Sequence, residues 1–420
     1  MIFSMDVRRA RKGDCLIVHY GSKDEPGLVL IDGGPSQVYK PHLEPRLGQI
    51  RKARGLGNNE SLPVDLMMVS HIDDDHINGI LELTKELVEA KASQQPLPLK
   101  IRSFWHNTFD DIIGNTPDEL VASVKASFGA ASLSGEPDTE GLDPDAARVL
   151  ASVGQGFRLR DDARNLQLRI NPQFGEKLVI AEKNGAPIDI GKGLKITVAG
   201  PMKAELIKLQ KDHDAFLKKN EADKKTKKAL ASFTDTSVAN LSSLVLLAEV
   251  SKKSMLLTGD ARGDKILEGL ELAGLLKKGK MHVNILKMPH HGSDRNIDRV
   301  FFQRVTADHY VFSGNGEHGN PERETLQMLL DENGDNEFTI HLTYPIDEID
   351  IGREADWKKE QQKEKTKKKD KPTTKVRENW SPKKHSLTSF FAENKDFAER
   401  VSIVQADTPH VIDLIDKIGF

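Results

Sequence analysis

A near-continuous apolar run, VDLMMV at residues 64–69, leads directly into Ser70 and the sequence HIDDDH at 71–76. An amphipathic pattern then extends from Ile77 to Ala90. The apolar run is typical of a buried strand, and the pattern that follows is typical of a helix that packs on a sheet. The dense histidine and aspartate run is therefore predicted to occupy a strand-to-helix turn, at the end of a strand where ligands collect in α/β proteins.

Polar residues also follow other predicted strands and hairpins along the chain. Because side chains at the ends of neighbouring strands can converge on a ligand, this repetition is difficult to attribute to packing alone. The alternation of strands, turns and helices predicts an α/β fold. The strands and hairpins concerned span 15–31, 99–105, 244–257, 283–288 and 310–313, and the turns that follow them carry Asp32, His106, Asp260, the pair His290-His291, and His318.

The HIDDDH turn carries His71, Asp73, Asp75 and His76, four metal donors within six residues. A divalent ion needs several nitrogen or oxygen donors that converge, and turns after rigid strands present them at little ordering cost. In an extended turn, residues 71 and 73 point one way, whereas 75 and 76 enter the helix and can face a neighbouring centre. The spacing therefore suits two adjacent metal ions better than one. Cys15 is the single cysteine, so the ligands must be histidine and carboxylate.

These motifs resemble the metallo-β-lactamase superfamily, whose signature His-x-His-x-Asp-His follows a strand. Here it stands as His71-x-Asp73-x-Asp75-His76, with aspartate at the second histidine position. This variant resembles the hydrolase domain of ComEC-type DNA-uptake proteins and their stand-alone soluble relatives. The further motifs that carry the resemblance are GDCLIV near the N-terminus, Asp32-Gly33-Gly34, LLTGDA at 256–261 and LKMPHHGS at 286–293.

The resemblance covers roughly residues 5–345. It implies a four-layer α+β architecture, the αββα metallo-β-lactamase sandwich, with helical and lysine-rich insertions. It also implies a site for two divalent ions, zinc first and manganese second, because Asp73 makes the ligand set harder. Asp260 would bridge the two ions. The remaining ligands would be His71 and Asp73 for one ion and Asp75 and His76 for the other.

Several positions leave alternatives open. One member of the pair His290-His291 would complete the second metal site, and the sequence does not decide which. Asp32 would hold a ligand in orientation, although Asp and Gly also favour an ordinary tight turn. The family's third histidine motif falls between the first cluster and Asp260, where His106 is the candidate. The remaining assignments are His318 as a loop histidine or a proton donor that contacts substrate, Ser293 and Asn320 as further contacts of that kind, and His19, His42, His282 and His309 as structural.

The resemblance implies hydrolysis by a metal-bound hydroxide, with no serine or cysteine nucleophile. Asp75, Asp260 and His318 are the predicted catalytic residues. The first interpretation is a phosphodiesterase or nuclease that acts on DNA or RNA, since ComEC-type relatives are associated with phosphodiester cleavage. The second is a hydrolase of a small ester, thioester or amide. The third is a metal-poor scaffold of the same fold that recruits a protein partner.

Composition separates the outer segments from the predicted hydrolase domain over 1–345. Hydrophobic residues make up 37% of the 420-residue chain and charged residues 30%, so a sizeable core must carry polar insertions. We predict a charged helical insertion at 204–235 and a lysine-rich flexible segment at 346–386, either of which could contact a protein partner. The lysine-rich segment is interpreted as a solvated linker, with contact to a polyanion as the alternative. Residues 387–420 regain apolar side chains and are expected to pack back on the core.

The overall charge of the chain points to no single class of partner. Its net value of −3 provides no global attraction to nucleic acid. Charged residues begin within the first ten positions, and no apolar stretch there reaches the length of a signal sequence or a membrane span. We therefore expect a cytoplasmic protein with no membrane segment.

Overall fold

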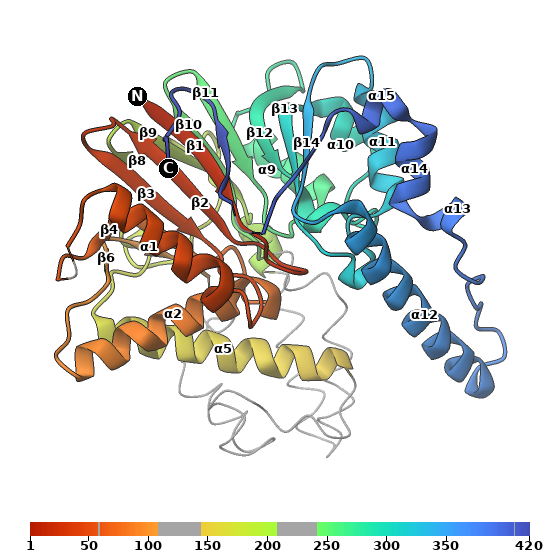
Figure 1. Cartoon of the computed structure of the whole chain (residues 1–420), viewed down its shortest axis with the longest axis horizontal. Coiled ribbons are helices and arrows are strands. Elements are labelled where there is room, and N and C mark those ends of the chain that lie inside the picture. Colours follow the sequence, from red (N-terminus) through yellow and green to blue (C-terminus); the bar gives the residue numbers. More distant parts are fainter. Residues whose placement is uncertain (58, 108–143, 208–241, 407) are drawn as a thin grey trace.

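The computed structural model describes residues 1–57, 59–107, 144–207, 242–406 and 408–420, and it combines helices with several β-sheets (Figure 1). The first sheet is formed, in spatial order, by β16 (His410–Asp413), β1 (Ile2–Val7), β2 (Leu16–Gly21), β3 (Pro26–Ile31), β5 (Leu66–Met68) and β7 (Phe104–Trp105). The strands from β16 to β3 are antiparallel, and β3, β5 and β7 are parallel. A separate parallel pair consists of β4 (Leu62–Val64) and β6 (Leu99–Ile101).

The second sheet is formed, in spatial order, by β15 (Val401–Ile403), β14 (Thr339–Leu342), β13 (Val305–Phe312), β12 (Met281–Lys287), β11 (Lys253–Leu257), β10 (Val245–Val250), β9 (Leu194–Gly200) and β8 (Ile188–Gly191). The strands from β8 to β11 are antiparallel, and those from β11 to β15 are parallel. Because β11, β12 and β13 are parallel neighbours, the turns after their carboxyl ends lie at one edge of the sheet. These are the turns that carry Asp260, the pair His290-His291, and His318.

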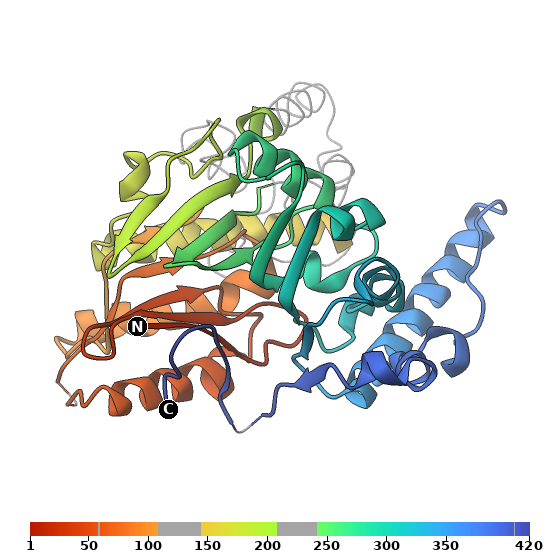
Figure 2. The same ribbon diagram turned by 90° about the horizontal axis from the view of Figure 1, so that it is seen from above.

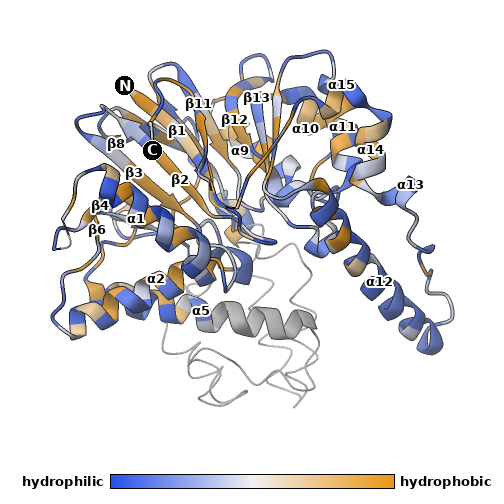
Figure 3. Ribbon diagram, viewed as in Figure 1, coloured by the Kyte–Doolittle hydropathy of each residue, from blue (hydrophilic) through white to orange (hydrophobic). Residues whose placement is uncertain are grey.

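The two sheets pack on each other through their inner faces, and helices cover their outer faces (Figures 1 and 2). The core between the sheets joins Met5 and Val18 of the first sheet to Leu246 and Ile285 of the second. Strands buried on both faces are rich in apolar residues throughout, as Figure 3 shows. The helices on the first sheet are α1 (Glu44–Ala53), α2 (Asp74–Ala92) and α5 (Pro144–Leu166), and those on the second are α9 (Gly263–Leu272), α10 (Arg299–Arg304) and α11 (Arg323–Asn333).

The chain after β14 differs from the flexible segment that the sequence predicts at 346–386. The helix α12 (Ile346–Asp370) projects away from the sheets, and residues 371–381 return alongside it (Figure 2). Ion pairs between neighbouring turns, such as Lys358 with Glu354 at 2.6 Å, favour the helix although few apolar residues are present. Three short helices follow, α13 (Pro382–His385), α14 (Leu387–Glu393) and α15 (Lys395–Ala398).

The C-terminal residues connect both sheets. Phe390 and Phe397 are buried in the core between the second sheet and its helices, and the chain then adds β15 to the second sheet and β16 to the first. No helix among the described residues combines the length and the apolar composition that a membrane crossing requires. The predicted charged insertion at 204–235 lies outside the described residues from position 208 onward.

A buried ion-pair network joins β1 to helix α1 and to the C-terminal residue. Asp6 accepts hydrogen bonds from Arg46 at 2.5 Å and from Arg8 at 3.1 Å, and Arg46 also donates to the carbonyl oxygen of Phe420 at 2.8 Å. Burial alone would raise the pKa of Asp6. The neighbouring His19, whose Nε2 lies 3.6 Å from Asp6 Oδ2, and the charges of the two arginines outweigh burial and lower this pKa to about 2.

We expect Asp6→Asn to lower the free energy of unfolding by about 2 kcal/mol at neutral pH, because the arginines stabilise the carboxylate form. A lowered carboxyl pKa contributes stability that is complete above the unfolded value near 3.8 and is lost as the pH falls through about 2. Urea unfolding of both proteins at a series of acidic pH values measures this difference. A difference that stays constant across that window would show that the carboxylate charge does not stabilise the fold.

Candidate metal centre

The HIDDDH turn joins β5 to α2. The helix begins at Asp74, and Asp73 is its N-cap with an extended backbone at φ −109° and ψ 151°. The backbone N–H of His76 donates to the carbonyl oxygen of Asp73 at 2.9 Å, which closes the first turn. His71 and Asp73 therefore precede the helix, whereas Asp75 and His76 lie in its first turn. The pair His71 and Asp73 and the pair Asp75 and His76 consequently approach the candidate metal centre from different directions.

The Asp32-Gly33-Gly34 turn follows β3 and lies against this first turn of α2. The N–H of Gly33 donates to the carbonyl oxygen of His76 at 2.8 Å. A Cβ atom at Gly33 would lie 2.4 Å from the backbone nitrogen of Ile80, so the close approach requires glycine. It brings Asp32 Oδ2 to 2.8 Å from His76 Nδ1, while Asp32 also accepts hydrogen bonds from the backbone and side chain of Ser70, both at 2.6 Å. Asp32 therefore lies behind His76 and turns Nε2 of that ring toward the centre.

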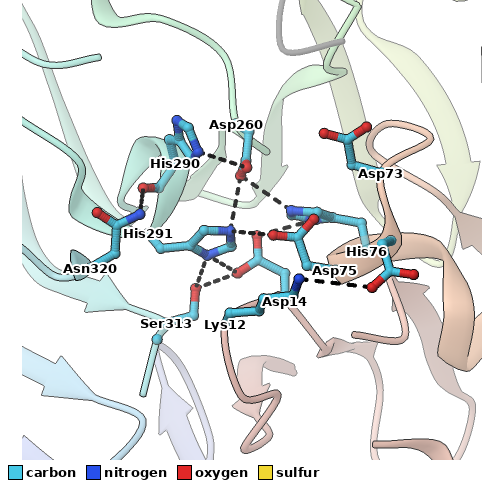
Figure 4. Close-up of polar contacts among 12 residues, drawn as sticks. Lys12, Asp14, Asp73, Asp75, His76, Asp260, His290, His291, Ser313 and Asn320 are labelled. Atoms are coloured by element: carbon cyan, nitrogen blue, oxygen red, sulfur yellow. Dashed lines mark hydrogen bonds and ion pairs between the residues drawn. The ribbon is translucent and has the colours of Figure 1, made fainter. Parts of the chain in front are cut away.

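Four buried or nearly buried side chains from three turns converge at one point (Figure 4). Each of Asp75, His76, Asp260 and His291 offers one ligand atom, and these atoms lie within 4.8 Å of one another. Asp260 Oδ1 lies 3.2 Å from His76 Nε2 and 3.4 Å from His291 Nε2. Asp75 Oδ2 lies 3.7 Å from the same nitrogen of His291. The structure thus brings residues 75 and 76 together with residues almost two hundred positions later in the chain.

The donor atoms of this group fit a divalent cation. His76 Nε2, His291 Nε2 and Asp260 Oδ1 are buried and make no hydrogen bond within the described residues. Buried polar atoms are ordinarily hydrogen-bonded, so such a set of donors aimed at one point needs an explanation. Two imidazole nitrogens and two carboxylates are the ligand types that zinc and manganese take. A metal ion would satisfy all of them together.

A second group of donors shares Asp75 with the first. His71, Asp73 and Asp75 also place one ligand atom each within 4.8 Å of one another. His71 Nε2, which is buried without a hydrogen bond, lies 3.8 Å from Asp73 Oδ2 and 3.8 Å from Asp260 Oδ2. The two oxygens of Asp260 therefore face different groups, with Oδ1 toward His76 and Oδ2 toward His71. This is the arrangement that a carboxylate shared by two metal ions requires.

The two histidine environments differ in charge. Burial and, to a smaller extent, the neighbouring His76 lower the pKa of His71 to about 4. At His291 burial acts in the same direction, but the carboxylates of Asp260 and Asp14 outweigh it and raise the pKa to about 9. His71 therefore presents a free electron pair at neutral pH, whereas His291 would have to release a proton to bind a metal.

Asp14 is a member of the site that the sequence analysis did not assign. It lies in the turn before β2, fully buried, 3.5 Å from His291 Nδ1 and 3.7 Å from His76 Nδ1. Ser313, at the end of β13, donates a hydrogen bond to Asp14 and lies 3.2 Å from His291 Nδ1. Asp14 thus orients His291 from behind, as Asp32 does for His76. The feature of the sequence that could have identified Asp14 is its position in the GDCLIV motif.

Lys287 is the second member that the sequence analysis missed. This last residue of β12 is 1% exposed and forms an ion pair with Asp14. Its ammonium also donates to the carbonyl oxygen of Gly259 at 3.1 Å and lies 3.8 Å from Asp260 Oδ1. Burial alone would raise the pKa of Asp14, but Lys287 and His291 outweigh it and lower that pKa. The lysine of the LKMPHHGS motif therefore provides positive charge behind the carboxylates.

The pair His290-His291 has an unusual backbone. Both residues adopt left-handed conformations, with φ values of 45° and 56°, and Gly292 continues the turn at φ 86°. Such values are uncommon outside glycine and occur at functional sites. The turn points the two rings in different directions, so His291 is buried in the four-donor group while His290, 28% exposed at its side chain, lies 3.6 Å from Asp260 Oδ2.

His106 belongs to none of the donor groups described above. It is buried at the end of β7 with its ring 4.7 Å from that of Phe104, and burial together with Arg160 lowers its pKa to about 3. Among the described residues, no group of three or more donors within 4.8 Å includes it. Both ring nitrogens of His106 are buried and make no hydrogen bond within the described residues, and its assignment to the third histidine motif stays a prediction.

The remaining candidates lie in the turns beside the centre. His318 is exposed, with a left-handed backbone at φ 60°. Asn320 is buried, and its side chain donates to the carbonyl oxygen of His290 at 3.3 Å. Ser293 is also buried, and its backbone N–H donates to that same oxygen at 3.0 Å. Asn320 and Ser293 therefore support the histidine turn, and His318 lies where solvent reaches it.

Comparisons with known proteins assign no family to this chain. No family model matches it. Microtubule-associated protein 1A from Rattus norvegicus and from Mus musculus is 33% identical over 76 residues, which are 18% of this chain and only 3% of the length of those relatives. A solved structure, described as a protein of unknown function from Enterococcus faecalis V583, covers 82% of this chain and 71% of its own, with 12% identity and a TM-score of 0.28.

Proposed function

We propose that this chain is a metal-dependent hydrolase with the metallo-β-lactamase architecture, and that it cleaves phosphodiesters. The observation that carries the proposal is the convergence of Asp75, His76, Asp260 and His291, whose ligand atoms lie within 4.8 Å of one another. Burying charges in this way costs several kcal/mol per ion unless a partner compensates them. The order of two facing sheets between outer helices supports the architecture.

The donor groups would hold two ions with Asp260 between them. His71 and Asp73 would bind one ion, and Asp75, His76 and His291 the other. Zinc is the first choice because of the imidazoles, and manganese the second because of the carboxylates. When bound, the pair of ions would lower the pKa of a water molecule toward neutrality and offset negative charge on a phosphoryl group.

The outer residues of the centre orient the ligands. Asp32 Oδ2, 2.8 Å from His76 Nδ1, favours a proton on that nitrogen and leaves Nε2 as the ligand atom. Asp14 and Ser313 do the same for His291 from the opposite side. Lys287 offsets part of the negative charge of Asp14, which lets several carboxylates remain ionised in a small buried volume.

Two residues in the turns beside the metal centre favour an anionic substrate. Lys12 Nζ lies 3.8 Å from Asp74 Oδ2 with 23% of its side chain exposed, so it presents positive charge beside the HIDDDH turn (Figure 4). His318 is exposed in the turn after β13 and can supply a proton to a leaving oxygen. Together with the motif series of the DNA-uptake hydrolases, these features favour phosphodiesters over neutral esters.

The proposal is tested by metal content and turnover of the purified protein. After loading with zinc or manganese, we expect about two equivalents of bound metal and hydrolysis of bis(4-nitrophenyl) phosphate. His291→Gln should lose at least one equivalent and most of the turnover, because its Nε2 is aimed into the four-donor group. His282→Gln is the control, because His282 is exposed on β12 and pairs with Asp308 at 3.1 Å, and this variant should retain both ions. Turnover of 4-nitrophenyl acetate alone would reject the phosphodiester assignment, and absence of bound metal would support a scaffold instead.

A further inference from the structure

The lysine-rich part of α12 is held in place by the segment that follows it. Trp357 Nε1 donates to the carbonyl oxygen of Glu378 at 2.8 Å, and Gln361 Nε2 donates to that of Arg377 at 2.9 Å. The ring of Trp357 packs against His385 with 4.3 Å between centroids. We refer to residues 353–385, the helix and its return, as the basic arm. The return segment therefore braces the helix along one side.

Most glutamates of the basic arm pair with partners within it. Glu364 accepts hydrogen bonds from the backbone and the guanidinium of Arg377 at 2.7 and 2.9 Å. Glu360 pairs with Lys363 at 2.5 Å, and Glu378 pairs with Lys384 at 2.8 Å. Residues 353–385 contain thirteen lysines and arginines against six aspartates and glutamates, although the whole chain has a net charge of −3. The arm is thus strongly positive on a chain that is acidic elsewhere.

One face of α12 presents a row of lysines to solvent. Lys359, Lys363 and Lys367 are exposed and line a shallow surface together with Gln362, Thr366 and, at one end, Asp370. A spacing of four residues places successive lysines about 6 Å apart along the helix. The return segment covers another face of α12, because its contacts with the helix are made by Trp357 and Gln361 and not by the lysine row. Within the described part of the chain, the ion pairs include none from Lys359 or Lys367.

The base of the basic arm packs on the turn that carries His318. Arg353 Nε donates to the carbonyl oxygen of Gly319 at 3.0 Å. A Cβ atom at Gly316 would lie 2.0 Å from the carbonyl oxygen of Ile349, so the turn and the start of α12 touch through their backbones. From this contact the helix extends outward, beyond the ends of the sheets (Figure 1). A polymer that lies along the arm can therefore continue to the rim of the metal centre, whereas a small substrate at the centre does not reach the lysine row.

We propose that the basic arm binds the sugar-phosphate backbone of a nucleic acid and holds it for the metal centre, an inference that rests on the proposed function. A duplex carries a negative charge about every 1.7 Å along its axis, so a row of lysines gains affinity by releasing counterions. The row contains no aromatic side chain, and Trp357 and Trp380 are packed with His385. Contacts to phosphates without base stacking give binding with little sequence preference.

The test compares K359Q/K363Q/K367Q with K52Q/K85Q/K277Q, which removes the same charge from exposed lysines elsewhere on the molecule. Binding of a fluorescently labelled DNA duplex is measured by anisotropy in EDTA, so that no cleavage occurs. We expect the arm variant to bind at least about tenfold more weakly, and the slope of log affinity against log salt to fall by about 2 to 3. The control variant should bind nearly as the unmodified protein does.

The outcomes separate this inference from the proposed function. Both variants should hydrolyse bis(4-nitrophenyl) phosphate like the unmodified protein, because the small substrate does not contact the arm. Equal DNA binding by the two variants would overturn the inference, and so would binding of phosphatidylserine vesicles or polyglutamate by the arm in place of DNA. If metal-loaded protein fails to hydrolyse the small phosphodiester while only the arm variant loses DNA binding, the hydrolase proposal fails and the arm remains a nucleic-acid-binding surface.

Discussion

Replacing Asp260 with asparagine is expected to reduce bound metal from about two equivalents to one or fewer. Turnover should fall by more than about 100-fold. This loss is larger than the tenfold to hundredfold loss caused by removing a residue that only orients a metal ligand. The reason is the position of its two oxygens, since Oδ1 lies 3.2 Å from His76 Nε2 and Oδ2 lies 3.8 Å from His71 Nε2. Asparagine keeps the volume of the side chain but removes its charge and one acceptor oxygen.

Asp264→Asn is the matched control for this substitution. Asp264 lies four residues later, in the first turn of α9, where it pairs with Arg262 at 2.9 Å and is exposed to solvent. Elemental analysis of the dialysed proteins, together with initial rates, measures both effects. Retention of two equivalents of metal by Asp260→Asn would show that this carboxylate does not join the two donor groups, and its assignment as the bridging ligand would then have to be abandoned.

Replacing Lys287 with methionine is expected to lower the free energy of unfolding by about 3 to 5 kcal/mol, the cost of leaving a buried charge without its partner. Lys287 is 1% exposed and pairs with Asp14, which is equally buried. Methionine fills much of the same volume, so the loss of packing is small. Denaturant unfolding in EDTA measures the difference, because chelation removes any stabilisation by bound metal.

The double variant Asp14→Asn/Lys287→Met identifies the cause of that loss. If the unpaired carboxylate is responsible, the double variant should be much more stable than the sum of the two single changes predicts. Lys265→Met serves as a control, since Lys265 pairs with Glu268 at 2.7 Å with 31% of its side chain exposed, and such pairs contribute at most about 1 kcal/mol. Additive effects at positions 14 and 287 would exclude charge compensation as the role of the lysine.

The turn around His71 was predictable because every feature that defines it is local. An apolar run ends at Val69, donors follow immediately, and the helical pattern begins at Ile77. The structure has this order, with α2 beginning at Asp74. The separation of His71 and Asp73 from Asp75 and His76 also follows from the start of the helix. Local periodicity and composition were sufficient for this part of the site.

Composition was insufficient to predict the structure of the lysine-rich segment. Its low apolar content predicts a flexible segment, because helices in proteins are usually stabilised by an apolar face that packs on a core. The basic arm is stabilised by other means, namely ion pairs between neighbouring turns and the contacts of Trp357 and Gln361 with the returning chain. Those contacts join residues 16 to 21 positions apart and leave no periodic signal.

The sequence by itself determined the local chemistry of this protein: the donors of the HIDDDH turn, the close Asp32-Gly33-Gly34 turn, and the polar turns that end its strands. Only the tertiary structure decided which distant groups meet those donors. It buried His291 among them and paired Asp14 with Lys287. The physical reason is that these contacts depend on the register of parallel strands and on the packing of two sheets, which join residues hundreds of positions apart, whereas sequence patterns report only neighbours within a few turns.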